Sequence, residues 1–265
     1  MIKKIIERPV DRRENYVKRC VGIPGDTLQI IDNQLFVNHQ PQEKIDGIQL
    51  NYFVQTNGTA FTNDDFEALG VSKDDRVMIA AEQQSDQLLM HIGIPLQEKG
   101  KPIYHMPLTK AALTKLSAIS DGCKVYTEKD ISGDGIYPLG NNYGWTRDNF
   151  GPIWIPKKGE TIELRIDNIN IYEKPIRNYE KNTLTIKDSI IYINGKVAKE
   201  YTFTMNYYWM MGDNRHNSAD SRYWGFVPED HIVGQPVFVW LSLDKDKSLF
   251  NGGIRWKRFL RSAKK

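Results

Sequence analysis

The sequence is poor in the residues that build disulfide scaffolds and zinc sites. It has two cysteines, Cys20 and Cys123, in 265 residues, which offer one pair and no metal-ligand spacing. The five histidines are scattered and lack the short paired spacing that zinc sites use. We therefore expect no disulfide framework, no metal and no cofactor, and whether the two cysteines pair stays open.

Long apolar runs and an excess of one charge are also absent. No apolar run approaches the roughly 18 residues that span a bilayer, and the opening MIKKIIERPVDRRENY is too charged for the apolar region of a signal peptide. Lys and Arg total 36 against 33 Asp and Glu, which gives no nucleic-acid footprint. We expect the chain as given to be soluble and to bind no nucleic acid.

The sequence does contain many short segments with the alternation and β-branched or aromatic content of strands. They are YVKRCVGI, NYFVQT, RVMIAA, KVYT, IWIP, ELRI, NIYE, YYWMMG and GQPVFVWLSL. Two short helices are predicted at 62–70, with Thr62 or Asn63 as cap and Gly70 as stop, and at 108–122, with Thr109 as cap and Gly122 as stop. The turn-rich residues 132–152 predict a long loop. The fold class is therefore mainly β, with a small helical part.

One strand pattern occurs twice. TLQIIDNQLFVN at 27–38 aligns with TLTIKDSIIYIN at 183–194, with the same Thr, Leu, Ile, Asp and Asn positions. Two copies are fewer than a repeat architecture needs. The pattern predicts two hairpins of one geometry.

Lys18 is the first candidate for chemistry. It lies in YVKRCVGI, where Lys18 and Cys20 would share one face of a strand. Burial of that face would disfavour the ammonium and leave a neutral amine that accepts a proton, as a general base must. From the residues alone, Lys18 is either such a base or an ordinary exposed strand lysine.

The second candidate is MGDNRHNSADSRYWGFVP, residues 211–228. Its density of Asp, Asn, Ser and Gly is typical of a loop whose side chains bond their own backbone, and Asp220 with Arg222 would then be an ordinary ion pair. The alternative is a wall of hydrogen-bonding groups around a functional residue. The segment alone leaves both open.

Taken together, YVKRCVGIPGD (16–26) and the 211–228 segment resemble the type I signal peptidases, the Ser/Lys proteases of family S26. The resemblance is close over residues 14–38 and 205–243. GWTRDNFGPIWIPKKGETI is similar to the insertion of Bacteroidetes-type members.

The resemblance implies a signal-peptidase-type β fold in which a large second domain interrupts the first. A catalytic β domain is split between residues 1–39 and 201–255. A β-rich inserted domain with short helices occupies 40–200, and 256–265 is a basic C-terminal tail.

The resemblance also implies a role for each matching residue. Lys18 falls on the general base, Ser218 on the hydroxyl that orients the Lys amine, Asp220 and Arg222 on a supporting ion pair, and Tyr16 and Val17 on the substrate pocket for small side chains. No metal is involved.

Two departures from the family pattern stand out. His216 occupies the place of the second Asp in the usual G-D-N-R-D-N-S, with an effect that stays open. The S-M-x-P-T segment that carries the nucleophilic Ser occurs nowhere in the 265 residues. We interpret the chain as a fragment whose nucleophile and membrane anchor precede Met1, and we expect it to be inactive alone.

The function that the resemblance implies is that of signal peptidase I, a serine endopeptidase with a Ser/Lys dyad. Its partners would be exported preproteins, and its location the bacterial inner membrane, with the catalytic domain on the periplasmic face. One alternative is a non-catalytic domain of peptidase descent that binds extended peptides, which the missing nucleophile favours. A self-cleaving repressor relative is disfavoured, because the sequence contains no recognisable helix-turn-helix and its charge is balanced.

Overall fold

The computed structural model describes residues 15–43, 45–79, 89–90, 93–94, 101–140, 143–249 and 252–263. Among these residues, no helix has both the length and the apolar character needed to cross a membrane. The described elements are mostly short antiparallel strands, so the prediction of a mainly β fold is confirmed.

Two antiparallel sheets form the middle of the molecule. Their orders are β1-β15-β16 and β4-β3-β2-β9. The strands are β1 (Arg19–Gly22), β2 (Thr27–Ile31), β3 (Gln34–Val37), β4 (Gln40–Pro41), β9 (Phe150–Trp154), β15 (Tyr207–Met211) and β16 (Val227–Pro228). Arg19 in β1 lies opposite Met211 in β15. This pairing brings the two segments with candidate chemistry side by side.

An aromatic core joins the two sheets. The Trp209 ring lies 5.3 Å, centroid to centroid, from both Phe150 and Phe226, and Trp209 is fully buried. Gly22 lets β1 approach this core, because a Cβ there would come within 2.3 Å of Ile155 Cδ1. The strand that begins after Lys18 is thereby fixed against the core.

The repeated sequence pattern forms two copies of one three-stranded meander. The second copy consists of β11 (Leu184–Lys187), β12 (Ile190–Ile193) and β13 (Lys196–Val197). Asn38 Oδ1 accepts from the Thr27 N–H at 2.8 Å, and Asn194 Oδ1 accepts from the Thr183 N–H at 3.0 Å. The first turn of each copy also has two left-handed residues, Asp32 and Asn33 or Asp188 and Ser189. The prediction of a shared hairpin geometry is confirmed.

A helix-containing unit lies between β4 and β9 in the chain. Its elements are β5 (Gln49–Gln55), α1 (Asn63–Leu69), η2 (Lys73–Asp75), β6 (Val77–Ile79), β7 (Ile103–Thr109), α3 (Lys110–Ile119) and β8 (Lys124–Thr127). The sheet order β6-β7-β5-β8, with all neighbours antiparallel, is that of a ferredoxin-like β-α-β-β-α-β arrangement. We call its described residues the α/β unit.

The α/β unit has an apolar core of its own. Val54 and Met106 of the sheet pack with Phe66 of α1 and Leu116 of α3. Both helices begin at the predicted caps: Thr62 forms a capping box with Asp65, and the Thr109 side chain accepts from the Ala112 N–H. The two predicted helices are therefore confirmed, α3 ending three residues before Gly122.

The strand predicted at NIYE is wrong. These residues lie in α4 (Ile169–Lys174), which continues into a π-helical turn (Pro175–Tyr179). Ile169, Tyr172 and Ile176 are buried at helical spacing, so packing against the core decides the conformation over the β-branched and aromatic composition. The neighbouring strands β10 (Thr161–Glu163) and β14 (Glu200–Thr202) pair with each other.

The last described residues form short elements. They are η4 (Glu229–His231), β17 (Phe238–Val239), η5 (Trp256–Arg258) and β18 (Arg261–Ser262), and β17 pairs with β18. Lys245 Nζ in this part lies 3.2 Å from Asp75 Oδ2 of the α/β unit. The predicted limits of the inserted domain and of the tail stay a prediction.

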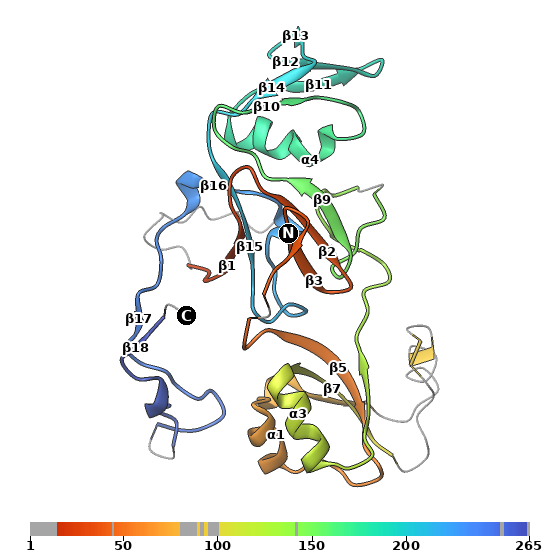
Figure 1. Ribbon diagram of the computed structural model, residues 1–265, viewed down its shortest axis with the longest axis vertical. Coiled ribbons are helices and arrows are strands. Elements are labelled where there is room, and N and C mark those ends of the chain that lie inside the picture. The colour runs from red at the N-terminus through yellow and green to blue at the C-terminus, as the bar shows by residue number, and fades with distance from the viewer. Residues whose placement is uncertain are drawn as a thin grey trace, which may run out of the picture.

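Figure 1 shows an elongated molecule in three tiers. The second meander and α4 lie at one end, the two central sheets in the middle, and the α/β unit at the other end. β17 and β18 lie to one side, on the left of the view. The loop that follows β15 meets the start of β5, because the Gln49 N–H donates to the Asp213 carbonyl at 2.9 Å.

Trp209→Ala should destabilise the chain by about 3–5 kcal/mol, because it removes the largest side chain of the central core. The free energy of unfolding in urea measures this. Trp256→Ala is the matched control, since Trp256 is 69% exposed, and it should change stability by no more than about 0.5 kcal/mol. Equal effects of the two variants would contradict the described core.

Candidate active site

Lys18 and Ser218 meet although they are far apart in the chain. Lys18 Nζ donates to Ser218 Oγ at 2.8 Å. Lys18 is half-buried and immediately precedes β1, while Ser218 is buried in the loop that follows β15. We call residues 213–218 the base loop. Pairing of β1 with β15 thus brings an amine and a hydroxyl into direct contact.

Asp220 and Arg222 form an ion pair behind this contact, and both are almost fully buried. Asp220 Oδ2 accepts from Arg222 Nη2 at 2.8 Å and from the Gly212 N–H at 3.1 Å. Asp220 also caps α5 (Ser221–Trp224). Arg222 Nη2 also donates to the carbonyl oxygen of Arg215. The buried pair therefore bonds the chain just before the base loop, at Gly212, and within the loop, at Arg215.

Gly212 makes room for the Lys18 contact. A Cβ at this position would lie 2.2 Å from Ser218 Oγ and 3.5 Å from Lys18 Nζ. Any side chain would displace the hydroxyl, because real Cβ contacts do not come so close. The sequence alone did not single out Gly212 among the turn-forming residues of 211–228.

A second ion pair was missed by sequence reasoning. Arg19 donates from Nε and Nη2 to the two carboxylate oxygens of Asp213, each at 2.9 Å. The Asp213 interaction raises the pKa of Arg19. The sequence offered one sign of this pair: Arg19 directly follows Lys18 in the first motif, and Asp213 directly follows Gly212 in the second. This bidentate pair holds the start of the base loop against β1.

Tyr16 and Val17 lie at the surface beside Lys18. They are 72% and 75% exposed, and Lys18 Nζ lies 5.9 Å from the centre of the Tyr16 ring. Both side chains are thus accessible from solvent next to the amine. Their role in substrate binding stays a prediction.

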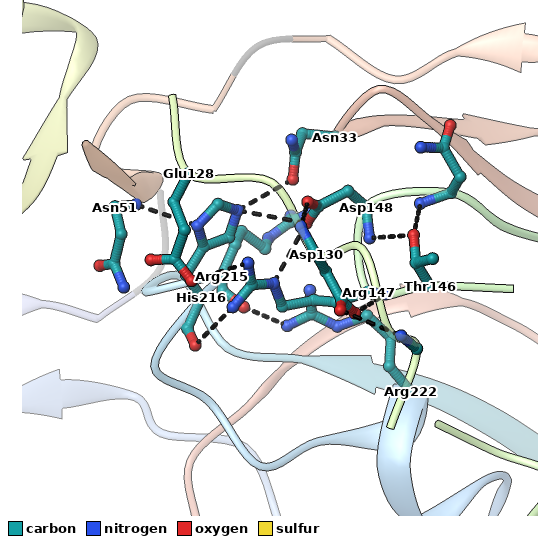
Figure 2. Close-up of polar contacts among 12 residues, drawn as sticks. Asn33, Asn51, Glu128, Asp130, Thr146, Arg147, Asp148, Arg215, His216 and Arg222 are labelled. Atoms are coloured by element: carbon teal, nitrogen blue, oxygen red, sulfur yellow. Dashed lines mark hydrogen bonds and ion pairs between the residues drawn. The ribbon is translucent and has the colours of Figure 1, made fainter. Parts of the chain in front are cut away.

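His216 enters a buried polar network (Figure 2). Its side chain is fully buried, and Nε2 lies 3.0 Å from Asn33 Oδ1 and 3.3 Å from Asp148 Oδ1. Nδ1 accepts from the Asn51 N–H at 3.1 Å. The partners come from the β2–β3 turn, from β5 and from the long loop after β8. No feature of the sequence had indicated these partners.

The network continues through charged groups. Arg147 donates to Asp148 and Glu128, each at 3.1 Å, and Glu128 pairs with His105 at 2.7 Å. Burial alone would raise the pKa of Asp148, but hydrogen bonds from His216 and the Asp130 N–H and the charge of Arg147 lower it to about 2. Glu128 likewise keeps a pKa of about 2 against burial, through His105, Asn51 and Arg147.

The described residues contain no group of three or more His, Cys, Asp or Glu side chains that could hold a metal ion. Cys20 and Cys123 are both free thiols. The chemistry available at the site is that of an amine, hydroxyls and a buried ion pair, which suits proton transfer.

The low pKa of Asp148 predicts a specific loss of stability in acid. A carboxyl whose folded pKa is lowered stabilises the fold above its unfolded value of about 4, and the contribution is lost as the pH falls from there toward about 2. Asp148→Asn should therefore flatten the dependence of the unfolding free energy on pH in this window. Asp188→Asn, in an exposed turn, should leave it unchanged. An unaltered slope for Asp148→Asn would contradict the network.

Comparison with known proteins agrees with this geometry. Residues 5–89 and 155–241 match the family described as signal peptidase, peptidase S26. Similar curated proteins include the signal peptidase I of Buchnera aphidicola subsp. Schizaphis graminum, 37% identical over 122 residues, and that of Helicobacter pylori strain 26695, 42% identical over 131 residues. The signal peptidase I of Haemophilus influenzae is 41% identical over 70 residues.

These matches are partial on both sides. They cover 41%, 44% and 26% of this chain and 38%, 45% and 20% of the respective relatives. The chain thus spans less than half the length of the curated relatives it matches. The likeness to Bacteroidetes-type members stays a prediction. The family match itself extends over both motifs and well over half of the sequence, and the chain belongs to the signal peptidase family, peptidase S26.

Proposed function

We propose that this chain supplies the general base of a signal peptidase I, a serine endopeptidase that removes signal peptides from exported preproteins. The observation that carries the proposal is the 2.8 Å hydrogen bond between Lys18 Nζ and Ser218 Oγ, formed by two motifs from opposite ends of the sequence. Ser218 orients the amine, and Asp220 with Arg222 holds Ser218 in place. Membership of the S26 family supports the same reaction.

The reaction is an acyl transfer from the peptide to a serine. The Lys18 amine takes the proton of the nucleophilic hydroxyl, whose oxygen attacks the scissile carbonyl. The C–N bond breaks, the leaving amine receives the proton from Lys18, and water then hydrolyses the acyl-enzyme. The nucleophilic Ser belongs to an S-M-x-P-T segment that the 265 residues do not contain. This chain alone is therefore inactive in our proposal.

The substrate binds as an extended strand. β1 is the edge of the sheet β1-β15-β16, so the backbone leading to Lys18 has a side on which a peptide can pair. Tyr16 and Val17 are exposed beside the amine and line the pocket for small side chains. Exported preproteins with small residues before the cleavage point fit this arrangement.

The whole protein acts at the bacterial inner membrane, with its catalytic part on the periplasmic face. The similarity to proteins named signal peptidase I supports this placement, because signal peptides are removed where exported proteins cross the membrane. The balanced charge of the chain supports no role for nucleic acid.

Cleavage of a peptide with an Ala-x-Ala site tests the role of Lys18. The chain alone should not cleave it, whereas a chimera with the Ser-bearing segment of a relative placed before Asn15 should. Lys18→Met in the chimera should lower the rate roughly 10²- to 10⁴-fold, because the base is lost. Liquid chromatography of the products measures the rate.

Two outcomes would contradict the proposal. Turnover by the chain alone that Lys18→Ala abolishes would place the nucleophile within these residues. A chimera that binds the peptide without cleaving it would favour the non-catalytic peptide-binding domain.

Gly212→Ala in the same chimera should lower the rate on the order of 10²-fold, because the new Cβ displaces Ser218 Oγ from Lys18. Gly234→Ala is the matched control, since a Cβ there meets nothing within 4 Å. Circular dichroism and the melting temperature should show both variants folded. Equal rates for the two variants would argue against Ser218 as the orienting group.

A further inference from the structure

Four residues of the base loop are bonded to β5 of the α/β unit. The Gln49 N–H donates to the Asp213 carbonyl, and the Arg215 N–H donates to the Gln49 carbonyl, both at 2.9 Å. This forms a parallel bridge between Gln49 and Asn214. The start of β5 therefore acts as a short strand partner for the residues that lead to Ser218.

The side chains beyond this bridge continue the attachment. The amides of Asn51 and Asn217 pair reciprocally, at 3.1 and 3.0 Å. Between these contacts, His216 Nδ1 accepts from the Asn51 N–H at 3.1 Å. Asp213, Arg215, His216 and Asn217 are thus each hydrogen-bonded to β5, and Ser218 is the next residue.

The bonds of His216 determine the tautomer of its imidazole. A backbone N–H can only donate, so Nδ1, which faces the Asn51 N–H, carries no proton. The proton is then on Nε2, which donates toward Asn33 Oδ1 at 3.0 Å and Asp148 Oδ1 at 3.3 Å. The ring is neutral and both nitrogens are occupied. Arg147 Nη1 also donates to the His216 carbonyl at 3.4 Å.

His216 therefore joins three parts of the chain in one buried position. Asn33 belongs to the first meander, Asn51 to the α/β unit, and Asp148 to the loop that returns from it (Figure 2). Two residues later, Ser218 Oγ meets Lys18 Nζ. A shift of the imidazole would be carried to the hydroxyl, because only Asn217 separates His216 from Ser218 in the chain and Asn217 is itself bonded to Asn51.

We propose that His216 is a positioning residue that locks the base loop to β5 and so holds Ser218 Oγ against Lys18 Nζ. The α/β unit is then part of the apparatus that orients the base. This inference rests on the proposed pairing of Lys18 with Ser218.

The test is NMR of the full 265-residue chain labelled with ¹³C,¹⁵N-lysine, in which Lys18→Arg assigns the Lys18 signals. The carbon-bound Hε protons correlate with Nζ whatever the charge of the amine, so the Lys18 Hε–Nζ cross-peak reports the surroundings of Nζ. Ser218→Ala provides the reference spectrum of Lys18 without its partner. In His216→Gln, which lacks an acceptor at the Nδ1 position, we expect the Lys18 cross-peak to be moved to the Ser218→Ala position. A merely structural role would lower the melting temperature and leave this cross-peak in place.

Asn217→Ala keeps the test decisive should His216→Gln fail to fold, because Asn217 is exposed and its loss removes one amide pair of the same attachment. It should shift the Lys18 signals toward those of Ser218→Ala. The matched controls are His231→Gln, an exposed histidine paired with Asp230, and Asn57→Ala, whose amide bonds the Asp121 carbonyl within the α/β unit. Both should leave Lys18 unchanged.

The outcomes separate the two proposals. If Ser218→Ala leaves the Lys18 signals in place, the Lys18–Ser218 pair of the proposed function is wrong, and this inference fails with it. If Ser218→Ala moves them and folded His216→Gln and Asn217→Ala do not, the inference alone is overturned.

Discussion

The site depends on one buried ion pair, that of Asp220 with Arg222. Neither charge reaches solvent, so each must be satisfied within the protein, and the removal of either would leave an uncompensated buried charge at a cost of about 3–5 kcal/mol. The bonds that satisfy them are the Gly212 N–H and the Arg215 carbonyl. Because the Gly212 N–H and the Arg215 carbonyl both bond to the buried pair, the chain between them folds back toward it. Ser218 then lies beside Lys18.

Around this pair, three further sets of contacts hold the base loop in place. Arg19 and Asp213 tie the loop to β1, Gln49 and Asn51 tie it to β5, and His216 connects it to the charged network of Asp148 and Arg147. The Lys18 amine itself has one hydroxyl partner and stays half-buried. A base that receives a proton in a bound substrate complex needs both rigid surroundings and an accessible reactive group.

Local patterns in the sequence predicted much of this fold. Thr62 and Thr109 start helices because their hydroxyls accept the first free N–H groups, which is a local property. The two meanders follow from turn residues and one Asn in each copy, which are also local. The strand predicted at NIYE was wrong because the burial of Ile169 and Tyr172 against distant residues outweighs composition. The ferredoxin-like order of the inserted strands could not be predicted, since pairing between distant strands leaves no local pattern.

The candidate site divides in the same way. Lys18, Ser218, Asp220 and Arg222 were found through two motifs whose resemblance to a family names each residue. The sequence does not indicate the role of Gly212, because that role depends on how close Gly212 lies to Ser218 in the folded chain. The partners of His216 are spread over three segments, and no spacing relates Asn33, Asn51 and Asp148 to it. Sequence reasoning finds residues that act within a motif and misses those that act across the fold.

The two ends of the α/β unit lie next to each other. Its first strand and its exit are neighbours, because the Glu128 N–H donates to the Asn51 carbonyl at 3.0 Å. A segment with adjacent ends adds little closure entropy to its host, whatever its length. The chain can therefore lengthen or shorten beyond β5 without disturbing the central sheets, whereas residues 49–51 must keep their spacing from the base loop.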